Sequence, residues 1–440
     1  MPKKILTVAV LLLAPLTAGA QRKPLSLEEA VAAGLERSPA LQASQAAVDA
    51  RAAEAREVAA ARLPALKLGG GYTRLSEVPD FQVSLPIAPD PIVVSRSYFN
   101  NFNLRLGLQQ PVFTGLRLEA GERSARMLES AAGRDLAKDR ADLIYAVKSA
   151  YWGLAKAREV EKLVEENIRL VSEHLEDVRA FFGQGLVTRN DVLRAELELS
   201  NAEIMRIDAR NASETALAAL DSLIGLPLAT DVELTTSAAG QASRIPAEAP
   251  AADPVEEALE RRPDLQAADL RIKAFEWGVK AARSGLYPQV FLAGNYYYLR
   301  PNPRYLPALD EFKGTWDLGV SVSFDLWDWG RTKSRAEGAR AQLARARGAR
   351  ELLEDHVILE VTQDRLALLR AKEKVRVAGQ AVGLAEENFR VSRERFRQGV
   401  ALSADVLDAE VAWLGARVNR TRAEIDLVLA QARLDKALGL

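Results

Sequence analysis

The sequence predicts a mixed α/β membrane protein with an internal two-fold repeat, built from long helices and four β-strands. Three observations predict this fold class. A fifteen-residue segment occurs twice, at 182–196 and 396–410, with eight identical positions at an offset of 214 residues. Helical patterning continues almost without interruption from residue 118 to about residue 181. Apolar and polar residues alternate strictly over 316–326, which is typical of a strand with two different faces.

Residues 1–20 have the pattern of a secretory signal peptide. Lys3 and Lys4 precede an apolar run at 5–16, and Ala18-Gly19-Ala20 resembles a small-residue cleavage site. A transmembrane anchor is the alternative, but the run is short and Pro15 interrupts it. We therefore expect an exported chain whose mature part begins near Gln21.

Composition argues against several kinds of chemistry. The 440 residues carry a net charge of −1, so the sequence has no overall basic character for binding nucleic acid. Cysteine is absent, which removes disulfides, thiolate metal sites and cysteine nucleophiles. The two histidines, His174 and His356, lie in charged helical runs, and we expect both to be solvated. We predict no catalytic residue, no metal and no cofactor.

Helix signals begin soon after the expected cleavage site. Ser26-Leu27-Glu28-Glu29 is a capping box, and the helix that it starts extends to about residue 62, restarting at Pro39 with Ser38 as a second cap. The long run at 118–181 would measure about 95 Å as one helix. A turn marked by Gly185 separates it from a further helix at 190–223.

Four strands are expected, at about 66–75, 98–110, 289–299 and 315–326. Aromatic residues gather near the ends of the second pair, at Tyr296, Tyr297, Tyr298, Trp316, Trp327 and Trp329. These strands could form the edge of a β-sandwich or part of a transmembrane barrel with interfacial aromatic residues. The exported start, and the lack of another core to cover, favour the barrel. Residues 76–97, with four prolines, are expected to form an exposed loop.

Fixed offsets divide the chain into a first repeat at 21–227, a linker at 228–252 and a second repeat at 253–440. Pro64 matches Pro288 at an offset of 224, whereas Gln184 matches Gln398 at an offset of 214. The ten-residue difference lies between the two strands of each half, where a surface loop tolerates a change of length.

Both the strands and the helices indicate self-association. After the signal peptide no stretch reaches the roughly 18 apolar residues of a spanning helix, so membrane insertion would require strands. Four strands cannot close a barrel that shields their edges from lipid. The long helices are rich in alanine and charge, and helices of this kind bury a narrow apolar stripe against neighbouring helices.

The order of elements resembles the TolC family of outer-membrane efflux proteins over nearly the whole mature chain, from Ser26 to Leu440. The resemblance depends on the duplicated helix–strand–strand–helix–turn–helix order and on the prolines at 64 and 288. It depends also on the strand ends Pro111-Val112-Phe113 and Asp325-Leu326-Trp327, and on the two Gly-turn-Asp-Val-Leu segments.

This resemblance implies a homotrimer. Three times four strands would form a 12-stranded transmembrane β-barrel in the cell outer membrane, in contact with its lipid. The long helices would form an α-helical barrel that extends into the periplasm as a tunnel. A periplasmic adaptor (membrane fusion protein) and an inner-membrane pump would supply it, in a tripartite efflux pump or a type I secretion system.

The resemblance also assigns roles to the two turns, which would lie at the periplasmic tip. Adaptor docking is implied for Gly185, Leu186, Val187 and Thr188, and for Gly399, Val400, Ala401, Leu402 and Ser403. Glycine permits a tight turn there, and short side chains let another backbone approach. The alternative is an ordinary helix C-cap.

Three acidic residues match the periplasmic gate of the family: Asp191, Asp405 and Asp408. Asp405 and Asp408 are three residues apart and share a helix face, so three copies would place six carboxylates around one axis. Such a ring attracts cations. Asp405 could instead be only a favourable charge at a helix start.

One departure from the family concerns how the tip is held closed. The best-known member has a tyrosine and an arginine where this chain has Phe396 and Ala401, which offer neither a hydroxyl nor a guanidinium group. Arg194 or Arg397 paired with the acidic residues is a possible substitute. We therefore expect a resting channel that is less tightly locked.

Two other classes of function were weighed against a channel. An enzyme is disfavoured, because Gly183-Gln184-Gly185 follows a helix rather than a strand and two helical histidines form no catalytic triad. A periplasmic coiled-coil scaffold or adaptor without a membrane channel would account for the helices, but it leaves the alternating strands unexplained.

Overall fold

The computed structural model describes residues 23–84, 86–87, 90–228, 230–246 and 253–440. The expected signal peptide at 1–20 lies outside the described residues. The chain divides into two compact units, which are described one at a time. Unit 1 comprises residues up to 41, 140–258 and 359–440, and unit 2 comprises 42–139 and 259–358.

Long helices account for most of unit 1 and extend into unit 2. Their bounds are α1 Leu27–Arg37, α2 Pro39–Ala60, α3 Arg117–Gly183, α4 Arg189–Ile224, α5 Ala238–Ala242, α6 Pro254–Arg261, α7 Pro263–Ala282, α8 Arg331–Arg397 and α9 Ser403–Ala437. Helix α1 begins as its sequence predicts, because the Ser26 side chain accepts from the Glu29 backbone and the Glu29 carboxylate accepts from Ser26 N–H. Among the described residues, none of the helices is long and apolar enough to cross a bilayer.

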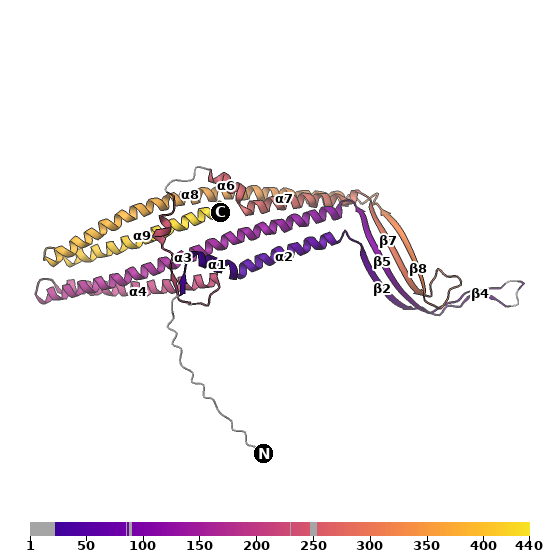
Figure 1. Cartoon of the computed structure of the whole chain (residues 1–440), viewed down its shortest axis with the longest axis horizontal. Coiled ribbons are helices and arrows are strands. Elements are labelled where there is room, and N and C mark those ends of the chain that lie inside the picture. The colour runs from indigo at the N-terminus through magenta and orange to yellow at the C-terminus, as the bar shows by residue number, and fades with distance from the viewer. Residues whose placement is uncertain (1–22, 85, 88–89, 229, 247–252) are drawn as a thin grey trace, which may run out of the picture. The chain divides into compact units, whose positions relative to one another are not determined.

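Unit 2 contains one four-stranded antiparallel sheet, in the order β2-β5-β7-β8. The strands are β2 Ala65–Arg74, β5 Asn100–Thr114, β7 Gln289–Arg300 and β8 Lys313–Ser323, and they lie side by side in Figure 1. We expected Pro111 to end its strand, but β5 continues to Thr114. A register shift between Pro111 and Phe113 accommodates the proline, which has no N–H for the ladder.

The two faces of this sheet have different chemistry. Residues directly opposite one another share a face, and the register aligns Leu68 with Leu106, Leu106 with Tyr296, and Tyr296 with Trp316. On the other face, the Arg105 guanidinium donates to Asn295 Oδ1 at 2.7 Å, and Asn295 Nδ2 donates to Asp317 Oδ1 at 2.7 Å. A continuous polar chain therefore crosses three strands on one side, and an apolar surface covers the other.

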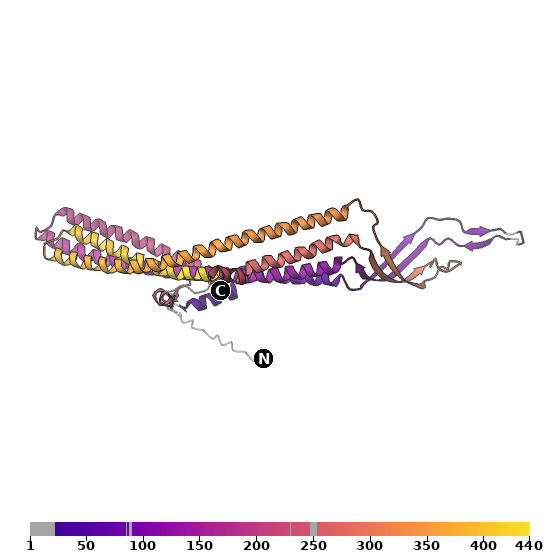
Figure 2. The same ribbon diagram turned by 90° about the horizontal axis from the view of Figure 1, so that it is seen from above.

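Unit 1 is built around two helical hairpins, α3–α4 and α8–α9. Figures 1 and 2 both place the two hairpin turns at the same end of this unit. Away from the turns, Tyr151, Trp152, Leu154 and Leu220 are fully buried in one core with Ile425 and Val428 of α9. This core fixes α9 against α3 and α4, so it holds the hairpins in register.

The expected linker at 228–252 is not unstructured in its described part. Strand β6 Val232–Leu234 pairs in parallel with β1 Lys23–Leu25, and α5 follows it. The Tyr151 hydroxyl donates to Leu25 O at 3.0 Å and accepts from Thr236 N–H at 3.1 Å, which joins β1 and the segment after β6 to α3. The composition of this segment, rich in Ala, Ser and Thr, did not indicate the two-stranded sheet, in which Val232 is buried.

The proline-rich loop at 76–97 likewise contains regular structure. Strands β3 Phe81–Val83 and β4 Ile92–Ser95 form an antiparallel pair. The Asp80 carboxylate accepts from Ser97 N–H at 2.8 Å and so closes the base of the hairpin. Pro79, Pro86 and Pro91 lie outside both strands, where they remove no ladder hydrogen bond.

Candidate functional site

Two matching turns join the helices at the hairpin end of unit 1. Gly185 and Gly399 both have φ of 73°, in the left-handed region. In the first turn, Gly185 N–H donates to Phe182 O at 2.9 Å and Leu186 N–H donates to Phe181 O at 3.0 Å. In the second turn, Gly399 N–H donates to Phe396 O and Val400 N–H donates to Arg395 O. This is the Schellman pattern that ends a helix at glycine. The sequence repeat therefore encodes two turns of the same geometry.

Replacing either glycine with alanine should destabilise its hairpin by about 1 kcal/mol, because an L side chain is disfavoured at this φ. A Cβ at Gly185 or Gly399 would meet no atom within 4 Å, so steric conflict adds nothing. Thermal unfolding of Gly185→Ala and Gly399→Ala checks this expectation. Gly183→Ala, where a Cβ is equally free and φ is not positive, is the matched control and should not lose stability.

The turn residues divide into exposed and inward-facing groups. The side chains of Leu186, Val400 and Leu402 are 67%, 61% and 69% exposed. Val187 and Ala401 are half-buried and pack against a core that contains Phe396, Val178, Phe389, Val406 and Ala409. The two turns therefore present these large apolar side chains to solvent, while Val187 and Ala401 pack inward.

Each of the three expected gate carboxylates has a different environment. Asp191 accepts from Thr188 N–H at 2.9 Å and from the Thr188 hydroxyl at 2.6 Å, and these hydrogen bonds lower the pKa of its carboxyl. Asp405 accepts from Leu402 N–H at 3.2 Å, so it also caps its helix, and it stays exposed. Asp408 is exposed and has no hydrogen bond or ion pair within the described part of the chain. Of the three carboxylates, Asp191 is thus held most firmly by hydrogen bonds to its own turn, and Asp408 is held least.

Two arginines were proposed for a substitute lock, and the charge of Arg194 adds to the Thr188 hydrogen bonds in lowering the pKa of Asp191. Arg397 lies 3.6 Å from Asp177 of α3 instead of pairing with Asp405 or Asp408. Phe396 is 2% exposed, and its ring lies 5.1 Å from the His174 ring and 5.3 Å from the Phe181 ring. Phe396 therefore belongs to the core of the hairpin end and does not project toward a neighbour.

The expectation that His174 is solvated was wrong. His174 is 6% exposed, and burial lowers the pKa of its imidazole to about 4, so the ring is neutral at neutral pH. Its Nε2 lies 2.9 Å from Ser403 Oγ, and Ser403, expected at the docking surface, is only 3% exposed. Apolar residues at 171, 175 and 178 put His174 on the buried face of α3, a signal that the charged neighbours obscured.

Sequence reasoning also missed Glu410, the last residue of the repeated segment. It is 1% exposed, and neither carboxylate oxygen has a hydrogen-bond partner. Burial raises the pKa of this carboxyl to about 8. Val406 and Trp413 occupy the same face of α9 at helical spacing, so the apolar period could have identified this position as buried.

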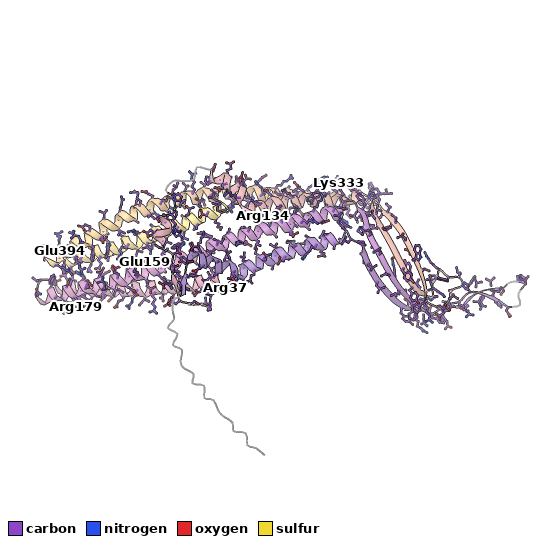
Figure 3. The ribbon with its side chains drawn as sticks, viewed as in Figure 1. Arg37, Arg134, Glu159, Arg179, Lys333 and Glu394 are labelled. Atoms are coloured by element: carbon purple, nitrogen blue, oxygen red, sulfur yellow. The ribbon has the colours of Figure 1, made fainter. Side chains whose placement is uncertain are left out.

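Ion pairs join the helices around these groups. Arg393 of α8 pairs with Glu173 of α3 at 3.0 Å, and Arg179 of α3 pairs with Glu196 of α4 at 2.7 Å. Figure 3 labels Arg179 and Glu394 close to the two turns. The Arg179–Glu196 pair is largely exposed and so adds little stability, whereas the Arg393–Glu173 pair is half-buried. The hairpin end thus combines an exposed acidic and apolar surface with a buried, partly ionisable interior.

Most of the chain matches a known protein family. The family model described as outer membrane efflux protein matches residues 31–226 and 255–440. The chain is 26% identical over 334 residues to the outer membrane efflux protein BepC of Brucella suis, which covers 76% of the chain and 71% of BepC. It is 24% identical to the alkaline protease secretion protein AprF of Pseudomonas aeruginosa, and the aligned region covers 76% of the chain and 69% of AprF. The chain spans from 58 to 79% of the length of the curated relatives that it matches, and less than two thirds of several of them.

A solved structure shares the fold. The outer-membrane channel OprN superposes with a TM-score of 0.77, covering 94% of this chain and 89% of OprN at 22% sequence identity. Because only 22% of the residues are identical, this similarity shows that the two proteins share an arrangement of helices and strands.

Proposed function

Because this chain belongs to the outer membrane efflux protein family, we propose that it is the outer-membrane channel of a tripartite efflux pump or a type I secretion system. The family membership agrees with the resemblance that the sequence predicted, and it makes the chain an outer-membrane protein. The observation that carries the proposal is the four-stranded sheet, which is apolar on one face and polar on the other.

A closed barrel follows if copies of the sheet join edge to edge. Strands β2 and β8 are the outer strands of the sheet, and neighbouring strands alternate in direction. Strand β8 of one copy would thus lie antiparallel to β2 of the next, and three copies would give twelve strands. The apolar face would meet lipid, and the polar chain of Arg105, Asn295 and Asp317 would line the interior.

The helices of unit 1 support the same homotrimer. Large apolar side chains project from α4 at Leu193, Leu197, Ile204 and Ile207, and from α8 at Leu359, Leu366, Val377 and Leu384. The lining of a groove between α8 and α9 includes four alanines, whose small side chains allow close approach of a helix, and charged residues at its sides: Ala378, Ala381, Ala416 and Ala423, with Arg370, Glu373, Lys374, Arg422 and Asp426. We propose that α4 of a neighbouring copy covers this groove, which would build the α-helical tunnel.

We also propose that the chain is a duplicated unit, with repeats at 21–227 and 253–440. Helices α3 and α8 have 67 residues each, and the helices that follow them have 36 and 35. In this arrangement Asp405 and Asp408 form the gate ring, and Asp191 contributes from the first repeat. A periplasmic adaptor that links the tip to an inner-membrane pump would dock on Leu186, Val400 and Leu402, whose exposed apolar side chains fit such a surface.

Fractionation and single-channel recording test this function. The protein should be recovered in the outer membrane, should have about three chain masses in detergent, and should conduct ions in a planar bilayer. Recovery in the soluble periplasmic fraction would support the alternative, a coiled-coil scaffold or adaptor without a channel. A monomer that inserts without conducting would contradict the barrel.

The resting conductance should exceed that of a homologue with a fully locked tip, because Phe396 is buried and Arg397 pairs within its own chain. Ala401→Arg, which adds a guanidinium group at the turn, should lower the conductance. Ala401→Gln is the control of similar length without charge. If the wild-type current is already as small as that of a locked homologue, the expectation of a looser tip is wrong.

A further inference from the structure

Glu410 is a buried carboxyl group for which the proposed channel has no use. It lies on α9 at the hairpin end of unit 1 and is 1% exposed, and neither carboxylate oxygen accepts a hydrogen bond. An ionised carboxylate without a partner is very costly in such surroundings, whereas a protonated one is tolerated. The packed arrangement therefore requires Glu410 to hold its proton.

Charged groups from the other helices of the two hairpins offer no neutralising partner. Arg393 of α8 lowers the pKa of Glu410, but its guanidinium already pairs with Glu173 of α3 at 3.0 Å. Glu173 and Glu198 of α4 both disfavour a second negative charge. The indole N–H of Trp413, on α9 itself, is also buried without a partner. Ionisation of Glu410 would consequently add an uncompensated charge beside two carboxylates.

The pKa of His174, on α3, is shifted in the opposite direction to that of Glu410. Its ring is neutral in the packed state, because burial and the nearby Arg393 lower its pKa, although Asp177 favours the charged form. Its hydrogen bond to Ser403 links it to the first residue of α9. The beginning of α9 therefore depends on a neutral histidine and on a neutral glutamic acid.

The pH dependence follows from these two shifts. The pKa of Glu410 is raised from 4.5 to about 8, so its contribution to packing is complete below pH 4.5 and is lost as pH rises toward 8. The pKa of His174 is lowered from 6.5 to about 4, so its contribution is complete above pH 6.5 and is lost as pH falls toward 4. Between pH 4.5 and 6.5 the two effects offset each other. Above pH 6.5 only Glu410 still changes, and packing weakens.

We propose that Glu410 is a proton-operated latch, which keeps the first turns of α9 packed while protonated and releases them when it gives up its proton to solvent in mildly alkaline medium. Asp405 and Asp408 lie in the same turns of α9, so release would move both carboxylates. The consequence for a pore rests on the proposed channel function. The release itself does not, because it is a property of the helical unit.

Hydrogen exchange on the full-length protein tests the release directly. The rate for peptides covering 400–415 is compared between wild type and Glu410→Gln, which keeps the shape and removes the charge. The wild-type to variant ratio should rise by at least about tenfold, and at most about 100-fold, from about pH 6 to about pH 8.5. Comparing the two proteins at each pH cancels the intrinsic pH dependence of exchange.

Two further variants keep this test decisive. Glu386→Gln removes an exposed carboxylate on α8 and should behave as wild type throughout. Glu410→Met provides a second uncharged side chain of similar length, in case the amide itself disturbs folding. A ratio that does not change with pH for either Glu410 variant would overturn the latch.

Bilayer recording separates this inference from the channel proposal. Wild-type conductance should rise at least about twofold from about pH 6 to about pH 8.5, and the rise should be absent in Glu410→Gln. Pores that conduct without this difference would contradict the coupling of the latch to the gate and leave the channel function standing. Protein that shows the exchange effect but never conducts would contradict the channel and leave the latch standing.

Discussion

Leu318→Arg will keep the protein out of the outer membrane. Leu318 lies in the middle of β8, is 69% exposed on the apolar face and covers Gly294 of β7. If that face meets lipid, an arginine near the midplane costs about 2–4 kcal/mol per copy, or about 6–12 kcal/mol for three copies. That penalty is of the order of the whole stability of a typical domain. The amount of protein in the outer-membrane fraction should fall at least about tenfold.

Ser321→Arg is the matched control for this prediction. Ser321 lies three residues further along β8, on the polar face that would line the water-filled interior. The same new charge should therefore leave the outer-membrane fraction unchanged. If both variants are lost to the same extent, the two faces of the sheet do not differ in their surroundings, and the barrel proposal fails.

If Asp405 and Asp408 form the proposed gate ring, removing their carboxylates should abolish most of the cation preference of the proposed channel. Asp405→Asn combined with Asp408→Asn would remove six negative charges from the pore of a trimer. Rings of carboxylates favour cations, so the permeability ratio of cation to anion should fall several-fold toward unity. Asparagine keeps the side-chain oxygen that Asp405 offers to Leu402 N–H, so the fold should survive. The reversal potential in a salt gradient measures the effect.

Asp191→Asn separates pore charge from helix capping. Asp191 is held by two hydrogen bonds to Thr188, which makes it chiefly a structural residue at the start of α4. Asparagine keeps an oxygen for these bonds but loses the negative charge at the helix start, so the free energy of unfolding should fall by only about 0.3–1 kcal/mol. Selectivity should change much less than in the double variant. A larger loss of selectivity in Asp191→Asn than in the double variant would reverse these assignments.

Local signals predicted much of the fold. The capping box at Ser26, the glycines at 185 and 399, and the alternation in β8 each determine the conformation of a few neighbouring residues. Such short-range constraints can be predicted from a single sequence. Segments whose structure depends on distant partners were missed. Strand β6 forms because β1, some 200 residues earlier, supplies its hydrogen bonds.

The candidate site shows the same division. The sequence identified the two turns and their acidic residues, because both depend on spacing within a single hairpin. It misjudged His174 and overlooked Glu410, because their burial depends on side chains from other helices. Charged neighbours along α3 suggested a solvated histidine, whereas Phe396 and Ser403 enclose it in the folded unit.

The sequence by itself determined the order of the long helices and of the four strands of the main sheet, the two glycine turns and the family, since these depend on periodicity and on residues close together in the chain. Only the tertiary structure decided which polar groups are solvated. It exposes Asp405 and Asp408, ties Asp191 to Thr188 and encloses Glu410 without a partner. The physical reason is that desolvation of a side chain depends on every helix packed around it, whereas helix propensity and turn geometry depend on near neighbours.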